Sequence, residues 1–369
     1  MEDYMSRKLL SYTAIGLILG STAIADVPKV AVDIAPVHSL VSRVMEGVSS
    51  PKLIIPSGAS PHEYSLRPSE AKSLQDADMV IWIGEDLAPW MEKSIETLTK
   101  NAEVITLLEE SDTKLLDFRE GALFEEHDHG EHDDHDDHDD HDEHDHGEHD
   151  GHDDHDGHDE HDHDKDHDDH DNHDDHDDHN HDKNHDDHDD HEDHDGHAHG
   201  EHDPHAWLST ENAQTWLNLV AGKLSASDPE NAGVYFANAA AAREEINDLV
   251  KEVNSILEPV RGRNFVVFHD AYQYFETSFD FPAAGAISLS DATDPSAARI
   301  AEIQDRVKDE GINCVLSEPQ FNANLVETVI SGTDAKTGVI DPLGLGLEPG
   351  PKLYGDLIRN MGKALAGCL

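Results

Sequence analysis

Short apolar runs alternate with helical stretches in both halves of the sequence. In the first half the pattern predicts buried strands at 30–32, 53–55, 79–83 and 104–105, with helices at 37–45 and 68–75. In the second half it predicts strands at 265–268, 284–287, 314–316 and 339–340, with helices at 296–309 and 353–365. Strands that alternate with helices pair in parallel through crossover connections. We therefore predict an α/β fold of two lobes, each a mostly parallel sheet flanked by helices.

A long helical pattern lies between these two halves. A first helix is predicted from Thr210 to Leu224, and the segment 227–230, Ser-Asp-Pro-Glu, then combines a capping residue with a proline and an acid in the first turn. Apolar residues follow at helical spacing, namely Val234, Ala237, Ala241, Leu249, Val253 and Ile256. At about 1.5 Å per residue this helix is roughly 45 Å long. We predict residues 228–259 as one helix that links the lobes.

The N-terminus is typical of a cleaved signal peptide. Arg7 and Lys8 precede an apolar run from Leu9 to Leu19, and small residues end at Ala25. The run is shorter than the ~20 apolar residues that a membrane span needs. A buried N-terminal helix is the alternative, but nothing amphipathic supports it. We expect residues 1–25 to be removed and the product to lie in the periplasm.

Residues 125–203 form a tract of a different composition. It holds 40 acidic and 2 basic residues, so it carries −38 of the total charge of −57, and 27 histidines lie between His127 and His202. Its repeat, His-Asp-Asp with substitutions, contains too few apolar residues to fold by burial. We predict a disordered loop inserted into a first lobe of residues 26–227, followed by the linking helix and a second lobe of residues 260–369.

The charge of the chain indicates what it binds. A strongly acidic protein repels nucleic acid and attracts cations. Imidazole binds zinc, copper and nickel, so the tract offers many weak metal sites. The alternative is a solvating acidic segment without a metal role. Candidate sites for weak zinc capture are His127, His129, His132, His135, His138, His141, His197, His199 and His202.

The chain contains two cysteines, Cys314 and Cys368. In an oxidising compartment an even pair is typical of a disulfide. Such a bond closes a loop of 54 residues and, on the chain-entropy model, contributes about 4 kcal/mol. Two unrelated buried thiols are the alternative.

Four histidines lie outside the tract, and three of them follow predicted strands or occupy turn-rich loops. These three are His62, His205 and His269, whereas His38 opens a predicted helix and is interpreted as structural. In open parallel sheets ligands bind beyond the C-terminal ends of the strands. Three imidazoles that meet there suit Zn²⁺, which prefers nitrogen ligands. Each histidine taken singly is more often a surface or core group.

Five motifs in order resemble those of the ZnuA-type zinc-binding proteins of ABC importers. They are Gly-Ala-Ser-Pro-His-Glu-Tyr-Ser-Leu-Arg-Pro-Ser at 58–69, Pro-His-Ala-Trp-Leu-Ser at 204–209, Phe-His-Asp-Ala-Tyr at 268–272, Ser-Glu-Pro-Gln-Phe at 317–321 and Asp-Pro-Leu-Gly at 341–344. The resemblance runs from about Val30 to the C-terminus. It implies two α/β lobes with the metal in the cleft between them.

The resemblance also implies roles for individual residues. His62 and His205 are expected to bind the metal from the first lobe and His269 from the second. The fourth position differs among relatives: some leave it to water, some use an acid next to the first histidine, and some use an aspartate of the second lobe. An acid before the first histidine is absent here, because Pro61 precedes His62, and Asp341 matches an aspartate of the second lobe. Asp341 is our candidate, with a turn beside Pro342 as its alternative role.

The resemblance further implies a Cys314–Cys368 disulfide and partners in the inner membrane, namely an ABC permease and its ATPase. We expect a monomer that carries zinc. A zinc hydrolase is the first rival, but the sequence contains no His-Glu-x-x-His run and no nucleophile elbow. A metal buffer that never meets a transporter is the second rival. We therefore predict a binding protein and not an enzyme.

Overall fold

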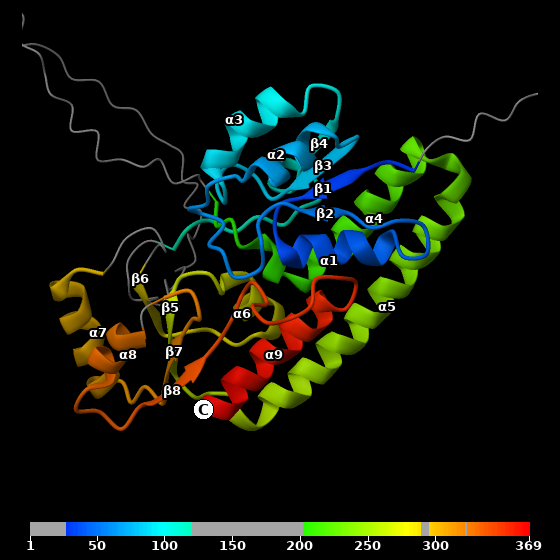
Figure 1. Cartoon of the computed structure of the whole chain (residues 1–369). Helices are drawn as coiled ribbons and strands as arrows, with labels where there is room; N and C mark the ends of the chain where they lie inside the picture. The colour runs from blue at the N-terminus through cyan, green and yellow to red at the C-terminus, as the bar shows by residue number, and fades with distance from the viewer. Residues whose placement is uncertain (1–26, 120–201, 289–294, 322) are drawn as a thin grey trace, which may run out of the picture. The chain divides into compact units, whose positions relative to one another are not determined.

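The computed structural model describes residues 27–119, 202–288, 295–321 and 323–369. The expected signal peptide, and the tract histidines from His127 to His199, lie outside these residues. Within them two four-stranded sheets are present, each with helices packed against it (Figure 1). The predicted fold class is confirmed.

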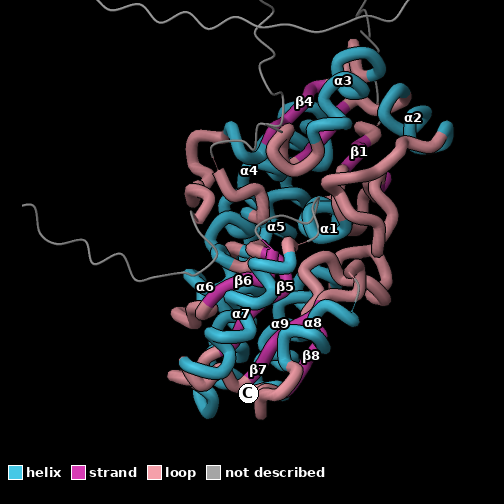
Figure 2. The backbone as a smooth tube through the Cα atoms, turned by 90° about the vertical axis from the view of Figure 1, so that its left-hand side faces the viewer, coloured by secondary structure: helices cyan, strands magenta, loops and turns pink. Residues whose placement is uncertain are grey.

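The first sheet contains four parallel strands in the order β2-β1-β3-β4. Its central strands are wholly apolar and buried, because helices cover both faces of a parallel sheet. Two of its helices, α2 and α3, lie together on one side of this lobe (Figures 1 and 2). The elements are β1 (Val30–Val32), α1 (Ala35–Val44), β2 (Lys52–Leu53), α2 (Pro68–Gln75), β3 (Met79–Trp82), α3 (Pro89–Leu98), β4 (Glu103–Thr106) and the short helix η1 (Leu107–Glu109).

The second sheet repeats this arrangement in the order β6-β5-β7-β8, again with parallel strands only. Alternate residues of β5 belong to different apolar clusters. Val266 and Phe268 pack with α7 and α8, while Phe265 and Val267 face the main core. The elements are β5 (Phe265–His269), α6 (Gln273–Phe279), β6 (Gly285–Ser288), α7 (Ala297–Asp309), β7 (Cys314–Ser317), α8 (Ala323–Ile330), β8 (Lys336–Val339) and α9 (Leu353–Cys368).

The predicted linking helix is present, with a 3₁₀ turn at each end. It consists of η3 (Pro229–Asn231), α5 (Ala232–Leu257) and η4 (Glu258–Val260), and it follows η2 (Ala206–Leu208) and α4 (Thr210–Ser227). Its buried face differs from the predicted one in the first half. Val234 is 40% exposed, and Tyr235 is buried instead, because its hydroxyl donates to the carboxylate of Asp228 at 2.8 Å. The alanine-rich run gives too little hydrophobic contrast to set this face from the sequence.

The two sheets share one apolar core. Helix α5 packs against α4 and α1 beside the first sheet and against α9 beside the second (Figure 1). Helix α9 also contacts α1, where the Ser39 hydroxyl accepts a hydrogen bond from the backbone N–H of Tyr354 at 2.9 Å. The boundaries of the two lobes therefore stay a prediction, since the main core takes in residues of both. No helix in the described part of the chain is long and apolar enough to cross a membrane.

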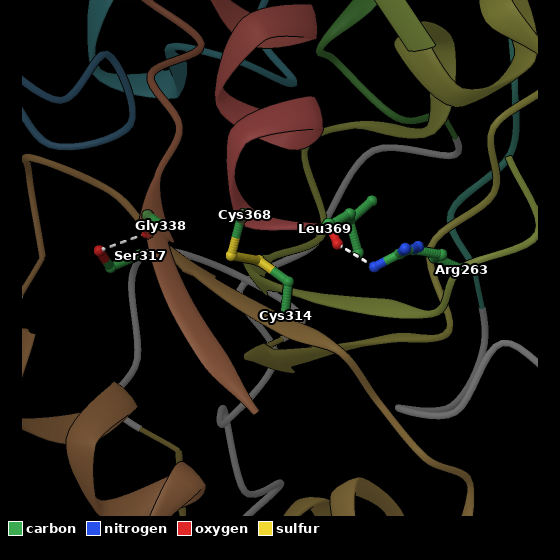
Figure 3. The surroundings of a disulfide bond; sticks show 6 residues. All are labelled: Arg263, Cys314, Ser317, Gly338, Cys368 and Leu369. Atoms are coloured by element: carbon green, nitrogen blue, oxygen red, sulfur yellow. Dashed lines mark hydrogen bonds between the residues drawn. A yellow bond between two sulfur atoms is a disulfide. The ribbon is translucent and has the colours of Figure 1, made fainter. Parts of the chain in front are cut away.

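The disulfide ties the C-terminal helix to the second sheet. Cys314 begins β7, and Cys368 ends α9; both are buried, and their sulfurs are bonded (Figure 3). The guanidinium of Arg263 donates to the carbonyl of Leu369 beside it. The expected pairing is confirmed. It holds α9 against the face of the sheet that belongs to the shared core.

A buried carboxylate marks the end of β1. Asp33 has no exposed surface, and its two oxygens accept the backbone N–H groups of Ile34 and Ile83, each at 2.7 Å. Burial raises the pKa of Asp33 to about 7, although both N–H groups act in the opposite direction. The side chain thereby joins the ends of β1 and β3. Its burial disfavours the charged form of the carboxyl group.

The stability of the metal-free protein should depend on pH through Asp33. Its pKa lies above the ordinary 3.8, so the folded state keeps a proton that the unfolded state loses. This stabilisation is complete below about pH 4 and is lost as the pH rises through about 7, at up to about 1.4 kcal/mol per pH unit. Urea unfolding with EDTA between pH 5 and 7 should show a shallower dependence for Asp33→Asn. Parallel curves for the two proteins would contradict the assignment.

Candidate metal site

Three histidines from distant parts of the chain meet between the two sheets. One ring nitrogen from each of His62, His205 and His269 lies within 4.8 Å of the others. The ring centroids of His62 and His205 are 5.5 Å apart, and those of His205 and His269 are 5.2 Å apart. No other cluster of three or more histidine, cysteine or acidic side chains with this spacing occurs among the described residues. The structure therefore brings together the three histidines that the sequence singled out.

His269 is the last residue of β5, and a carboxylate from the neighbouring strand orients its ring. Glu318 directly follows β7, which pairs with β5, so both side chains lie at the C-terminal edge of the sheet. The Nδ1 of His269 is 2.6 Å from Oε1 of Glu318. Because a carboxylate only accepts, Nδ1 carries the proton and donates it. The lone pair of Nε2 is then available to a metal.

His205 is oriented in the same way from its own loop. It precedes the short helix η2, and its Nδ1 lies 2.7 Å from Oδ1 of Asp203. The same oxygen accepts the backbone N–H of His205 at 2.9 Å. The side chains of Asp203 and His205 are both buried, so these hydrogen bonds are shielded from water. The Nε2 of His205 thus also presents a lone pair.

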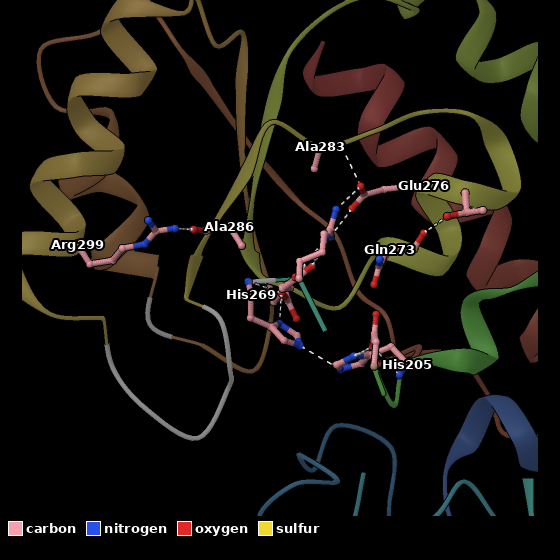
Figure 4. Close-up of polar contacts among 12 residues, drawn as sticks. His205, His269, Gln273, Glu276, Ala283, Ala286 and Arg299 are labelled. Carbon is pink, nitrogen blue, oxygen red and sulfur yellow. Dashed lines mark hydrogen bonds and ion pairs between the residues drawn. The ribbon is translucent and has the colours of Figure 1, made fainter. Parts of the chain in front are cut away.

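The two Nε2 atoms face each other at 3.4 Å (Figure 4). Two nitrogens bound to a tetrahedral Zn²⁺ at 2.0–2.1 Å lie roughly 3.3–3.4 Å apart. Two lone pairs at this distance repel each other, and a cation between them turns the repulsion into attraction. The spacing of His205 and His269 therefore fits two ligands of one zinc ion.

His62 reaches the site from a loop that aromatic residues hold in place. The loop follows β2, and the indole N–H of Trp90 in α3 donates to the carbonyl of Pro61 at 2.7 Å. The Tyr64 ring meets Trp90 edge to face, and its hydroxyl donates to Glu70 at 2.8 Å. Glu70 in turn accepts the backbone N–H of Arg67 and closes a capping box at the start of α2. This chain of contacts sets where His62 points.

The three imidazoles line a cavity of about 20 Å³. Its other walls include Trp207 from the first lobe and Phe321 and Pro342 from the second. The Trp207 indole donates to the Pro342 carbonyl at 2.9 Å, and the Phe321 ring meets that of His269 edge to face. The space holds one small ion with little more than a water molecule beside it. Organic ligands are excluded by size.

Buried negative charge surrounds this cavity. Asp203 is buried, and burial raises its pKa to about 7, although the backbone N–H of His205 and the charge of Arg119 act in the opposite direction. Asp270 follows His269, and the Arg119 guanidinium contacts both its carboxylate and that of Glu276. Anions inside a protein are costly unless a cation offsets them. The site therefore favours a cationic ligand.

Asp203 and Glu318 were not predicted from the sequence as parts of the site. The local signals were an acid two residues before His205 and an acid directly after a strand next to β5. Neither spacing is specific to metal sites. Only the fold shows that these carboxylates meet the Nδ1 atoms of His205 and His269.

Asp341 lies outside the group of three histidines. Its Oδ1 accepts the backbone N–H groups of Leu343 and Gly344, both at 3.0 Å. This is the turn-forming role that was the alternative in the sequence. Of the nine tract histidines named as weak sites, His202 is described: its Nδ1 is 2.9 Å from Asp117, and the two residues form an isolated antiparallel bridge.

Comparison with known proteins agrees with this geometry. The family model described as ZnuA, zinc-uptake complex component A, periplasmic, matches residues 30–368. The chain belongs to this family. Its similarity to curated members extends over nearly the whole length. A high-affinity zinc uptake system protein ZnuA from Brucella abortus (strain 2308) is 45% identical over 350 residues, which cover 95% of this chain and 94% of that protein.

One further relative and one solved structure are also similar to this chain. The high-affinity zinc uptake system protein ZnuA of Paracoccus denitrificans (strain Pd 1222) is 45% identical over 355 residues, which cover 95% of each chain. A crystal structure of ZnuA superposes with a TM-score of 0.64 at 17% identity, over 93% of this chain and 99% of that one. The second match shows the shared fold. Since the ZnuA family consists of periplasmic uptake components, the expected compartment and the expectation of a binding protein rather than an enzyme are confirmed.

Loss of the charge on Glu318 should weaken zinc binding. Glu318→Gln keeps an acceptor for the Nδ1–H of His269 but removes the negative charge behind the ring, so we expect the Kd for zinc to rise about 10- to 100-fold. Competition with a chromophoric chelator measures this change. Glu211→Gln, at an exposed position on α4, is the matched control and should bind like the parent. Equal affinity of all three proteins would contradict a role for Glu318.

Proposed function

We propose that this chain captures Zn²⁺ in the periplasm and hands it to the permease and ATPase of an ABC importer. His62, His205 and His269 are the proposed ligands. The observation that carries this proposal is the convergence of three ring nitrogens, two of them aligned by buried carboxylates. Membership of a family of zinc-uptake components supports the direction of transport. We expect the protein to act as a monomer.

Nitrogen donors support zinc as the cargo. Mn²⁺ and Mg²⁺ prefer oxygen ligands, and Zn²⁺ binds imidazole readily. The carboxylates of Asp203 and Glu318 engage the Nδ1 atoms of the histidines, so they raise the basicity of the rings without occupying a ligand position. Three imidazoles, two of which donate a hydrogen bond from Nδ1 to a carboxylate, fit zinc better than an alkaline-earth ion.

Release requires that the ligands separate. His205 lies on the side of the first sheet and His269 on the second, and the Trp207–Pro342 hydrogen bond joins the same two sides. A partner that binds the lobes in another relative position would pull one imidazole away from the ion. Such a partner needs only a differential affinity for the two arrangements. We propose the permease as this partner.

The histidine-rich tract is proposed as an auxiliary store of weakly held zinc. Its composition is the support, because many imidazoles among carboxylates offer interchangeable sites. Its end at His202 lies three residues before His205, so zinc bound near that end is close in sequence to the tight site. We infer that the tract raises the local zinc concentration.

Deletion of residues 127–197 should separate the two kinds of site. The shortened protein should keep one tight equivalent of zinc and lose the weaker ones, because the three proposed ligands lie outside the deletion. Replacing His62, His205 and His269 by alanine in the shortened protein should remove the tight equivalent as well. Isothermal calorimetry measures both stoichiometries. Retention of a tight equivalent by the triple variant would refute the ligand assignment, and unchanged stoichiometry after the deletion would refute the role of the tract.

Transport is tested in cells. A strain that lacks this protein should grow poorly in chelated medium and recover when zinc is added, because an importer subunit limits supply only when zinc is scarce. The parent gene should restore growth, and the triple histidine variant should not. Normal growth of the deletion strain under zinc limitation would favour a buffer that meets no transporter.

A further inference from the structure

We propose that Arg119 is a latch between the two lobes that slows the release of zinc. The latch consists of the Arg119 guanidinium and the carboxylates of Asp270 and Glu276 that bind it. Arg119 is a positioning residue, because it acts on His205 and His269 through the backbone beside them rather than as a ligand. The inference rests on the proposed function, since zinc is the cargo that the latch retains.

The guanidinium binds the two acids along two of its edges. Its terminal nitrogens donate to the two oxygens of Glu276 at 2.8 and 3.0 Å, and its Nε lies 3.1 and 3.0 Å from the two oxygens of Asp270. The side chain of Arg119 is 16% exposed, and those of the two acids are 6% exposed. Hydrogen bonds between a guanidinium and a carboxylate are strong, and shielding from water strengthens them further.

Both acids belong to the second lobe. Asp270 directly follows β5, and Glu276 lies in α6. Oε2 of Glu276 also accepts the backbone N–H of Ala283 at 3.0 Å (Figure 4). This hydrogen bond orients the carboxylate independently of Arg119, so the guanidinium binds to a partner that the second lobe already holds in place.

The backbone that leads to Arg119 is held by the first lobe. The side-chain amide of Asn212 in α4 accepts the backbone N–H of Lys114 at 2.8 Å and donates to its carbonyl at 3.0 Å. The Trp216 indole, also in α4, donates to the Thr113 hydroxyl at 2.9 Å. The ion pairs of Arg119 therefore run from a segment of the first lobe to two acids of the second.

The latch joins the chain beside one proposed ligand to the chain beside another. The carbonyl of Leu116 accepts the backbone N–H of Asp203 at 2.8 Å, so the segment that ends in Arg119 runs next to the loop of His205. On the other side, one of the two acids bound by Arg119 directly follows His269. The guanidinium thus holds the two facing imidazoles near each other without touching the metal.

Release of zinc requires that this latch opens. The three imidazoles line a cavity of about 20 Å³, so the ion leaves only after its ligands have moved apart. A form in which His205 and His269 are separated has to break the ion pairs of Arg119 as well. The latch therefore lowers the population of the open form, and the rate of release follows that population.

The direction of the effect distinguishes a latch from a simple effect of charge. Removing a positive charge near a metal site strengthens the attraction of the site for Zn²⁺, which slows release. Removing a latch makes release faster. Neutralisation of Arg119 therefore gives opposite results under the two explanations.

Stopped-flow measurement of zinc release tests the latch in the full-length protein. One equivalent of zinc is bound, an excess of a chromophoric chelator is added, and the slow phase reports the tight site. Arg119→Met keeps the aliphatic stem and removes the guanidinium, so release should become about 10- to 100-fold faster, as for the loss of charged hydrogen bonds. Association should be equal or faster, because zinc also enters through the open form.

Two further variants complete the test. Arg119→Lys keeps the charge but loses the planar fork, so its release rate should lie between those of the parent and Arg119→Met. This variant also decides the question if Arg119→Met does not fold. Arg43→Met is the matched control, because Arg43 is 15% exposed and pairs with Glu46 and Glu245. It should release zinc at the rate of the parent.

The outcomes separate the inference from the proposed function. Release from the folded Arg119 variants at the rate of the parent, or more slowly, would overturn the latch and leave the proposed function intact. Equal acceleration in Arg43→Met would also overturn the latch, because it would show a general loosening of the fold. A parent that holds no tight equivalent of zinc would refute the proposed function itself.

Discussion

The metal site of this protein is organised around two imidazoles that face each other. The Nε2 atoms of His205 and His269 lie 3.4 Å apart, and each ring is turned by a buried carboxylate on its other nitrogen. Without those carboxylates, the Nε2 atom of either ring could carry the proton and would then have no lone pair for a metal ion. With them, the Nε2 atom of each ring already has a lone pair available before a cation binds. The alignment of these two rings is therefore a property of four side chains acting as two pairs, to which His62 adds a third imidazole.

The fold supplies these two pairs from different places and holds them together by a shared core. Asp203 and His205 lie on one loop, whereas His269 and Glu318 end neighbouring strands of the second sheet. Helices α5 and α9 join the two sheets, and the disulfide fixes the end of α9 to β7. The interface between the two lobes is broad along these helices. At the histidine site it includes the Trp207–Pro342 hydrogen bond and the ion pairs of Arg119 with Asp270 and Glu276. Separation of the lobes at this site therefore has to break these contacts.

In the proposed function the chain combines two ways of binding a metal. In the described site a few ligands are aligned in advance, and their order is maintained by burial and hydrogen bonds. The proposed binding by the tract depends on the number of its ligands, because 27 histidines and a charge of −38 lie between residues 125 and 203. A prepared site binds tightly because the protein has already paid the entropy of ordering its ligands. Many interchangeable ligands bind weakly but exchange quickly, so the two devices complement each other.

The alternation of strands and helices, the linking helix, the cysteine pair and the three histidines could all be predicted from the chain's amino acids. These are local patterns, or residue types with few alternatives: four histidines lie outside the tract, and three of them follow strands or turns. The buried face of α5 and the carboxylates behind His205 and His269 became known only from the fold. The tautomer of an imidazole and the buried face of an alanine-rich helix depend on contacts through space. Spacing along the chain carries no information about either.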